Sequence, residues 1–63
     1  MPIIQASIIA GRPDEMKEKL IAELTDAAVR ALDAPRESVR VLITEIPAQN
    51  FGIAGVSARQ LGR

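Results

Sequence analysis

Residues 3–32 read IIQASIIAGRPDEMKEKLIAELTDAAVRAL, and the spacing of their apolar side chains changes once, at Gly11. Before Gly11, β-branched residues dominate residues 3–9, which predicts a β-strand. From Pro13 to Leu32 the apolar period becomes helical, which predicts an amphipathic helix with Pro13 at its first position. The expected apolar face consists of Met16, Leu20, Ile21, Leu24, Ala27, Ala28, Ala31 and Leu32.

A second strand is expected at residues 39–46, VRVLITEI, and Pro47 ends it. A strand, a long helix and another strand form a βαβ unit, whose two strands must run parallel. The helix is expected to cover the sheet face that carries Ile4, Ala6, Ile8, Val39, Val41 and Ile43. Glycines in the tail predict turns or a short hairpin. The expected fold is therefore α/β (α+β in some schemes), in a single domain spanning residues 1–63.

Composition excludes several classes of function. The chain has no cysteine and no histidine, which removes disulfides, thiol nucleophiles, the usual general base and the commonest metal ligands. Eight basic and eight acidic side chains cancel, so the chain offers no field that would attract nucleic acid. No apolar run approaches the roughly 18 residues of a membrane span. We expect a cytoplasmic protein without a metal, a nucleic-acid partner or a membrane anchor.

The chain is too apolar for its size to be a stable monomer. Of its 63 residues 48% are hydrophobic, yet only one is aromatic, and we expect no metal site or disulfide to crosslink the fold. One helix covers one face of a two-stranded sheet, and nothing in the chain covers the other face. We therefore expect a homo-oligomer, in which a second copy widens the sheet and further copies cover the bare face.

The amino terminus carries one unusual chemical group. Pro2 follows Met1, and a small second residue normally permits removal of the initiator methionine. The exposed secondary amine would have a pKa near ~8, the ordinary value of α-amino groups. Desolvation and a nearby cation would lower that pKa, so that the amine could act as a general base at neutral pH.

Two arginines are candidates to accompany this amine. In parallel strands both starts lie at the same end of the sheet, which brings Arg40 near Pro2. Arg12 follows the first strand, roughly 20 Å or more from Pro2 in its own chain, and could approach it only from another subunit. Both arginines can also be read without function, Arg40 as a solvated strand residue and Arg12 as a capping or surface residue.

Several short motifs recur in an order that resembles the 4-oxalocrotonate tautomerase family of the tautomerase superfamily. They are Met1-Pro2-Ile3, Gly11-Arg12 before Asp14-Glu15 and Lys17, Leu32-Asp33-Ala34-Pro35, Ser38-Val39-Arg40-Val41, Ile43-Thr44-Glu45 and Phe51-Gly52-Ile53. The resemblance covers essentially the whole chain. It implies a hexamer, built as a trimer of dimers from βαβ protomers, and an isomerase that needs no metal or organic cofactor.

The resemblance also implies roles for particular residues. Pro2 would be the catalytic base after loss of Met1, and Arg12 and Arg40 would bind the substrate. Phe51 matches the aromatic residue of the family's apolar pocket, and Ile9 matches a residue at the pocket wall. The implied substrate is a dienol dicarboxylate such as 2-hydroxymuconate, from catechol meta-cleavage, which would be converted to the conjugated 2-oxo acid.

Two positions depart from the family pattern. Pro13 stands where a helix-capping serine is expected, and Ala54 stands where a glycine is usual.

Two other functions stay open. A hydratase or dehalogenase of the same superfamily would act on small unsaturated acids, but it would recruit a further carboxylate that is not evident here. A non-catalytic oligomeric binding protein would instead retain Met1 and so block the amine.

Overall fold

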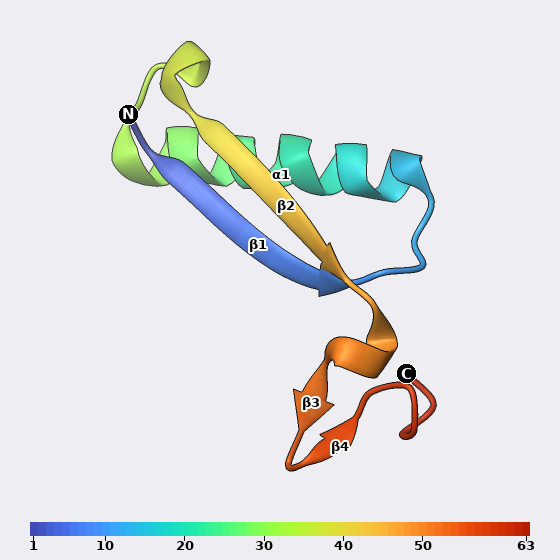
Figure 1. Ribbon diagram of the computed structural model, residues 1–63. Coiled ribbons are helices and arrows are strands. Elements are labelled where there is room, and N and C mark those ends of the chain that lie inside the picture. Colours follow the sequence, from blue (N-terminus) through green and yellow to red (C-terminus); the bar gives the residue numbers. More distant parts are fainter.

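The computed structural model describes all residues from Met1 to Arg63 and shows a two-stranded sheet, one long helix and a separate hairpin (Figure 1). The elements in chain order are β1 (Ile3–Ile9), α1 (Asp14–Leu32), the 3-10 turn η1 (Arg36–Ser38), β2 (Arg40–Ile46), the 3-10 turn η2 (Ala48–Asn50), β3 (Gly52–Ile53) and β4 (Val56–Ser57). The first strand has its predicted bounds, and the second begins one residue later than predicted, at Arg40.

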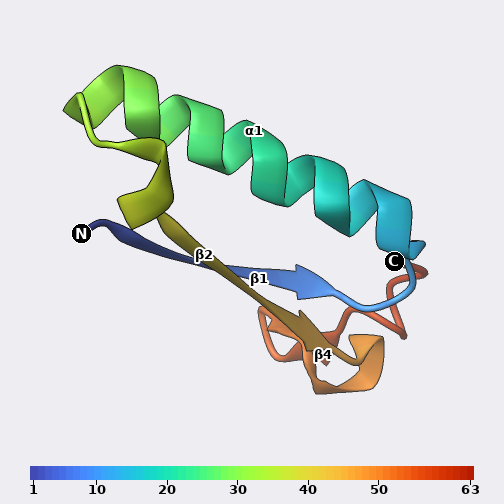
Figure 2. The same cartoon turned by 90° about the horizontal axis from the view of Figure 1, so that it is seen from above.

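Strands β1 and β2 pair in parallel, from Ile3 opposite Arg40 to Ile9 opposite Ile46. The helix α1 lies across one face of this pair (Figure 2), and the hairpin lies beyond the carboxyl ends of the strands, so that most of the opposite face is open (Figure 1). The predicted βαβ unit is thereby confirmed, and so is the short carboxy-terminal hairpin, which β3 and β4 form in antiparallel pairing.

Both ends of α1 are set by backbone geometry. Pro13 was expected at the first helical position, but it has an extended conformation (φ −68°, ψ 159°) and forms the N-cap, so the helix begins at Asp14. The carbonyl of Pro13 accepts a hydrogen bond from the amide of Met16 at 3.1 Å. The helix ends where Asp33 takes the left-handed conformation (φ 53°), and Pro35 disfavours a return to helical geometry at Ala34.

The predicted apolar face of α1 is only partly used within one chain. Leu20 and Leu24 are half-buried against the sheet, and Ala28 is buried. Other members of the face remain open to solvent: Met16 is 57% exposed, Ile21 is 40% exposed and Leu32 is 62% exposed. The two-stranded sheet covers only part of the apolar face of the helix, which leaves these side chains without cover.

The dimensions of the chain show that it lacks a closed core. Its radius of gyration is 14.4 Å, whereas about 10.6 Å is typical of a globular chain of this length. Ala28 and Ala58 are the only buried residues. The hairpin extends away from the helix and sheet, so it contributes little to their packing (Figure 1). These features support the expectation that the chain completes its core with other copies.

Ala54, one of the two departures from the family pattern, lies in the turn of the hairpin. Ala54 (φ 51°) and Gly55 (φ 84°) are the two residues between β3 and β4, and both have positive φ. This is the requirement of a type I′ turn, which glycine meets without strain. An L-residue in this region is disfavoured by about 1 kcal/mol because its Cβ crowds the following carbonyl.

We therefore expect Ala54→Gly to stabilise the protein by up to about 1 kcal/mol, because it relieves the strain at positive φ. Chemical denaturation followed by circular dichroism measures the change. Gly55→Ala is the matched control and should destabilise the protein, since it adds the same strain at the neighbouring position. An unchanged or lower midpoint for Ala54→Gly would contradict this assignment.

Lys17 joins α1 to β2 through charge. Its Nζ lies 3.0 Å from Asp14 Oδ1 and 3.0 Å from Glu45 Oε1. Glu45 continues the helix-facing side of β2 beyond Ile43, and Lys17 balances its charge. Hydrogen bonds to Asp14 and to Glu45 raise the pKa of Lys17 above its ordinary value, so the ammonium stays charged throughout the neutral range.

Replacing Lys17 with glutamine should lower the melting temperature at pH 7, because the tie between α1 and β2 is lost. The pKa of Lys17 is raised in the folded state, so its stabilisation is complete below about pH 10.4, the unfolded value. It should fade as the pH rises through the higher folded value, and the two melting curves should converge there. Lys19→Gln removes a lysine that forms no ion pair, and an equal effect at pH 7 would refute the role of Lys17.

Candidate active site

Pro2 and Arg40 lie next to each other where the two parallel strands begin. The amide of Arg40 donates a hydrogen bond to the carbonyl of Pro2 at 2.9 Å. Pro2 itself is half-buried, whereas Met1 is 80% exposed. The backbone register therefore fixes the amino-terminal residue beside the arginine, as the parallel arrangement predicted.

The guanidinium of Arg40 is held against the turn that precedes it. Its Nη1 donates to the carbonyl of Glu37 at 2.6 Å and to the carbonyl of Val39 at 3.4 Å. Arg40 forms no ion pair, and its Nε and Nη2 donate to no group of the protein. These two nitrogens form the planar edge that binds a carboxylate in bidentate fashion.

Arg12 and Ile9 lie at the opposite end of β1. Arg12 Nη1 donates to the carbonyl of Ile9 at 3.1 Å, and the Arg12 side chain is exposed. Strand β1 has seven residues, and at about 3.3 Å per residue it separates the two ends by roughly 20 Å. Arg12 therefore does not meet Pro2 within one chain.

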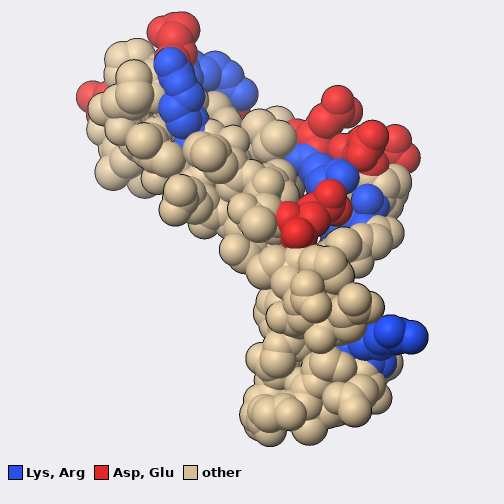
Figure 3. All heavy atoms as spheres, viewed as in Figure 1, with Lys and Arg blue, Asp and Glu red and all other residues tan.

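Phe51 lies in the segment that leads from η2 into β3. The amide of Ala58 donates to its carbonyl at 2.7 Å, which fixes the base of the hairpin, and its side chain is half-buried. Residues 47–63 include Arg59 and Arg63 but no acidic residue, and the projecting part of the molecule displays only basic charge in Figure 3. An anion close to Phe51 would meet no carboxylate from this segment.

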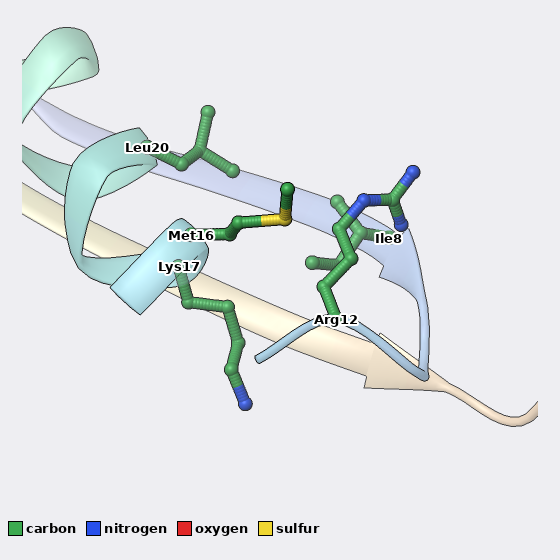
Figure 4. A pocket seen from close by; sticks show the side chains of 5 residues that line it. All are labelled: Ile8, Arg12, Met16, Lys17 and Leu20. Carbon is green, nitrogen blue, oxygen red and sulfur yellow. The ribbon is translucent and has the colours of Figure 1, made fainter. Parts of the chain in front are cut away.

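A pocket that the sequence did not reveal lies between α1 and β1, with a volume of about 280 Å³. Its lining consists of Ile8, Arg12, Met16, Lys17 and Leu20 (Figure 4). Lys17 is neutralised by its two carboxylates, whereas Arg12 has no acidic partner. The spacing of Arg12 and Lys17 around the helix start is the only signal that could have indicated this pocket. The pocket does not include Pro2 or Arg40.

The candidate residues thus form two groups that the chain itself does not bring together. Pro2 and Arg40 lie at one end of the sheet, while Arg12, Ile9 and Phe51 lie toward the other. No cluster of three or more acidic residues could hold a metal ion. The helix α1 is not long and apolar enough to cross a membrane.

The chain thus combines a βαβ unit, a terminal hairpin and an amino-terminal Pro2 whose carbonyl is hydrogen-bonded to the amide of Arg40. The family described as "Tautomerase enzyme" matches residues 2–60, and the chain belongs to this family of enzymes.

Several tautomerases resemble the chain over nearly its full length. The 2-hydroxymuconate tautomerase of Stutzerimonas stutzeri is 57% identical and covers 100% of both chains. A 4-oxalocrotonate tautomerase isozyme of Methylibium petroleiphilum has a TM-score of 0.96, with 47% identity over 98% of this chain and 100% of that one. A subunit of the heterohexameric 4-oxalocrotonate tautomerase of Chloroflexus aurantiacus J-10-fl has a TM-score of 0.93, with 33% identity over 97% of this chain and 98% of that one.

Proposed function

We propose that the protein is an isomerase that converts 2-hydroxymuconate, a dienol dicarboxylate, into the conjugated 2-oxo acid. The observation that carries this proposal is the hydrogen bond between the backbones of Arg40 and Pro2, which joins a potential base to an anion-binding group. Relatives named 2-hydroxymuconate tautomerase support the choice of substrate, since they match over their whole length.

The reaction moves one proton and needs one group to carry it. The nitrogen of Pro2 takes the proton of the 2-hydroxyl, and the oxygen lone pair forms the carbonyl at carbon 2. The double bonds shift along the chain, so that carbon 5 gains electron density and takes the proton back from the nitrogen. Pro2 thus acts first as the general base and then as the general acid, and it ends in its starting state.

The arginines bind the two ends of the substrate. Arg40, through Nε and Nη2, holds one carboxylate together with the 2-oxygen, where negative charge builds up in the transition state. Arg12 holds the distal carboxylate. Phe51 and Ile9 exclude water from the site, which favours the neutral amine of Pro2.

This arrangement requires more than one copy of the chain. Because Arg12 lies roughly 20 Å from Pro2, we propose that it reaches the amine of another subunit in a homohexamer, a trimer of dimers. Antiparallel alignment of two copies would place the end of one β1 near the start of the other. Assembly would also cover the exposed apolar side chains of α1, such as Leu32, which is 62% exposed.

Met1 must be removed for this chemistry, because it otherwise forms a peptide bond with the nitrogen of Pro2. The exposed position of Met1 makes that bond accessible to a processing enzyme. We further propose that residues 1–63 form one domain and that the enzyme acts in the cytoplasm on a freely diffusing acid.

Pro2→Ala should lower kcat/KM for 2-hydroxymuconate by about 10²-fold or more, because a general base contributes about that much. Intact mass must first establish that Met1 is absent, and ketonisation is then followed by ultraviolet absorbance. Gel filtration should show unchanged assembly. Full activity of the processed Pro2→Ala protein would refute the role of Pro2, and complete retention of Met1 in the wild type would favour a non-catalytic binding protein.

Arg40→Ala and Arg12→Ala should change different kinetic parameters. Arg40 acts where charge develops, so its loss should lower kcat, whereas Arg12 holds a group remote from the reaction, so its loss should mainly raise KM. Steady-state kinetics with 2-hydroxymuconate separates the two parameters, and Arg30→Ala, in the last turn of α1, serves as the control. Equal effects of all three changes would contradict the assignment.

The same protein should convert 3-haloacrylates far more slowly than 2-hydroxymuconate. Hydration and dehalogenation require an activated water, and none of the proposed site residues is a carboxylate that could activate one. Halide release measured with an ion-selective electrode provides the rate. A faster reaction with the haloacrylate would favour the hydratase or dehalogenase alternative.

A further inference from the structure

The turn η1 links the helix to the arginine that the proposed mechanism uses. It immediately precedes Val39 and Arg40, and its backbone is closed by hydrogen bonds from the amide of Ser38 to the carbonyl of Pro35 at 2.9 Å and from Val39 to Arg36 at 3.2 Å. The hydroxyl of Ser38 also donates to the carbonyl of Pro35 at 2.8 Å. The turn is therefore a small rigid unit.

This unit orients the guanidinium of Arg40. The carbonyls of Glu37 and Val39 both accept hydrogen bonds from Nη1, at 2.6 Å and 3.4 Å. A long arginine side chain has many rotamers in solution, and these two acceptors restrict them. Because both bonds use Nη1, they leave Nε and Nη2 available, so the position of the turn determines where that edge points.

One ion pair holds the turn against α1. Arg36 Nη1 lies 2.6 Å from Asp26 Oδ1, and the two residues are ten positions apart in the chain. No other hydrogen bond or ion pair joins η1 to the helix. Asp26 lies within the 19-residue helix α1, so the helix holds its backbone in place as an anchor for the turn.

We propose that Asp26 and Arg36 are positioning residues, which act on the reaction only through the orientation of Arg40. The proposal rests on the function proposed above. The ion pair is partly exposed, with side chains that are 38% and 56% accessible, so its contribution to stability is small. Its effect on catalysis can nevertheless be larger, because a displacement of about 1 Å in a catalytic group can lower the rate by about 10²-fold.

Asp26→Asn and Arg36→Gln should each lower kcat for 2-hydroxymuconate about 3- to 10-fold, a partial displacement of Arg40, with little change in KM. The double variant should fall no further than either single variant, because both remove the same contact. Glu23→Gln and Arg30→Gln are the matched controls on the same helix, since neither residue forms an ion pair. Melting temperature and gel filtration establish that each variant remains folded and assembled.

Three results would overturn the inference: wild-type kcat in both single variants, losses that add in the double variant, or losses equal to those of the controls. If Asp26→Asn fails to assemble, Asp26→Glu keeps the charge and should lose less activity than Arg36→Gln, and an equal loss would count against the inference. A wild-type protein without ketonisation activity would refute the proposed function itself, which separates the two failures.

Discussion

The structure depends on a mismatch between the apolar area of one helix and the area that a two-stranded sheet can cover. Strands β1 and β2 cover only the centre of the apolar stripe on α1, which leaves Met16 and Leu32 exposed, and the opposite face of the sheet carries exposed apolar side chains such as Leu42. The hydrophobic effect favours removing these surfaces from water. These uncovered surfaces support the proposed assembly with other copies of the chain.

The small size of the sheet also explains why the proposed site is divided between the two ends of the chain's sheet. Parallel pairing fixes Pro2 beside Arg40 at one end, and the length of β1 fixes Arg12 at the other. A chain with a larger sheet could gather all of these groups on its own loops. Here, assembly would have to supply both the missing core and the missing half of the site, so folding and catalysis would share one requirement.

Much of this architecture follows from local patterns. The predominance of β-branched residues predicted β1 at its observed bounds, and the helical period predicted α1 to within one residue. The error at Pro13 arose because proline suits both the N-cap and the first helical position, and the sequence pattern does not distinguish them. The predicted broad apolar face was only partly used, since the pattern does not reveal how much of it a narrow sheet can cover.

The amino-acid sequence by itself determined the order of the elements, the parallel pairing and the proximity of Pro2 to Arg40, because these follow from periodicity and from the rule that parallel strands start at one end. Only the tertiary structure showed the ion pairs of Lys17 and Arg36, the positive φ of Ala54 and the carbonyls that hold the Arg40 guanidinium. Such contacts join residues that are distant in the chain or depend on backbone angles, and no local period encodes either.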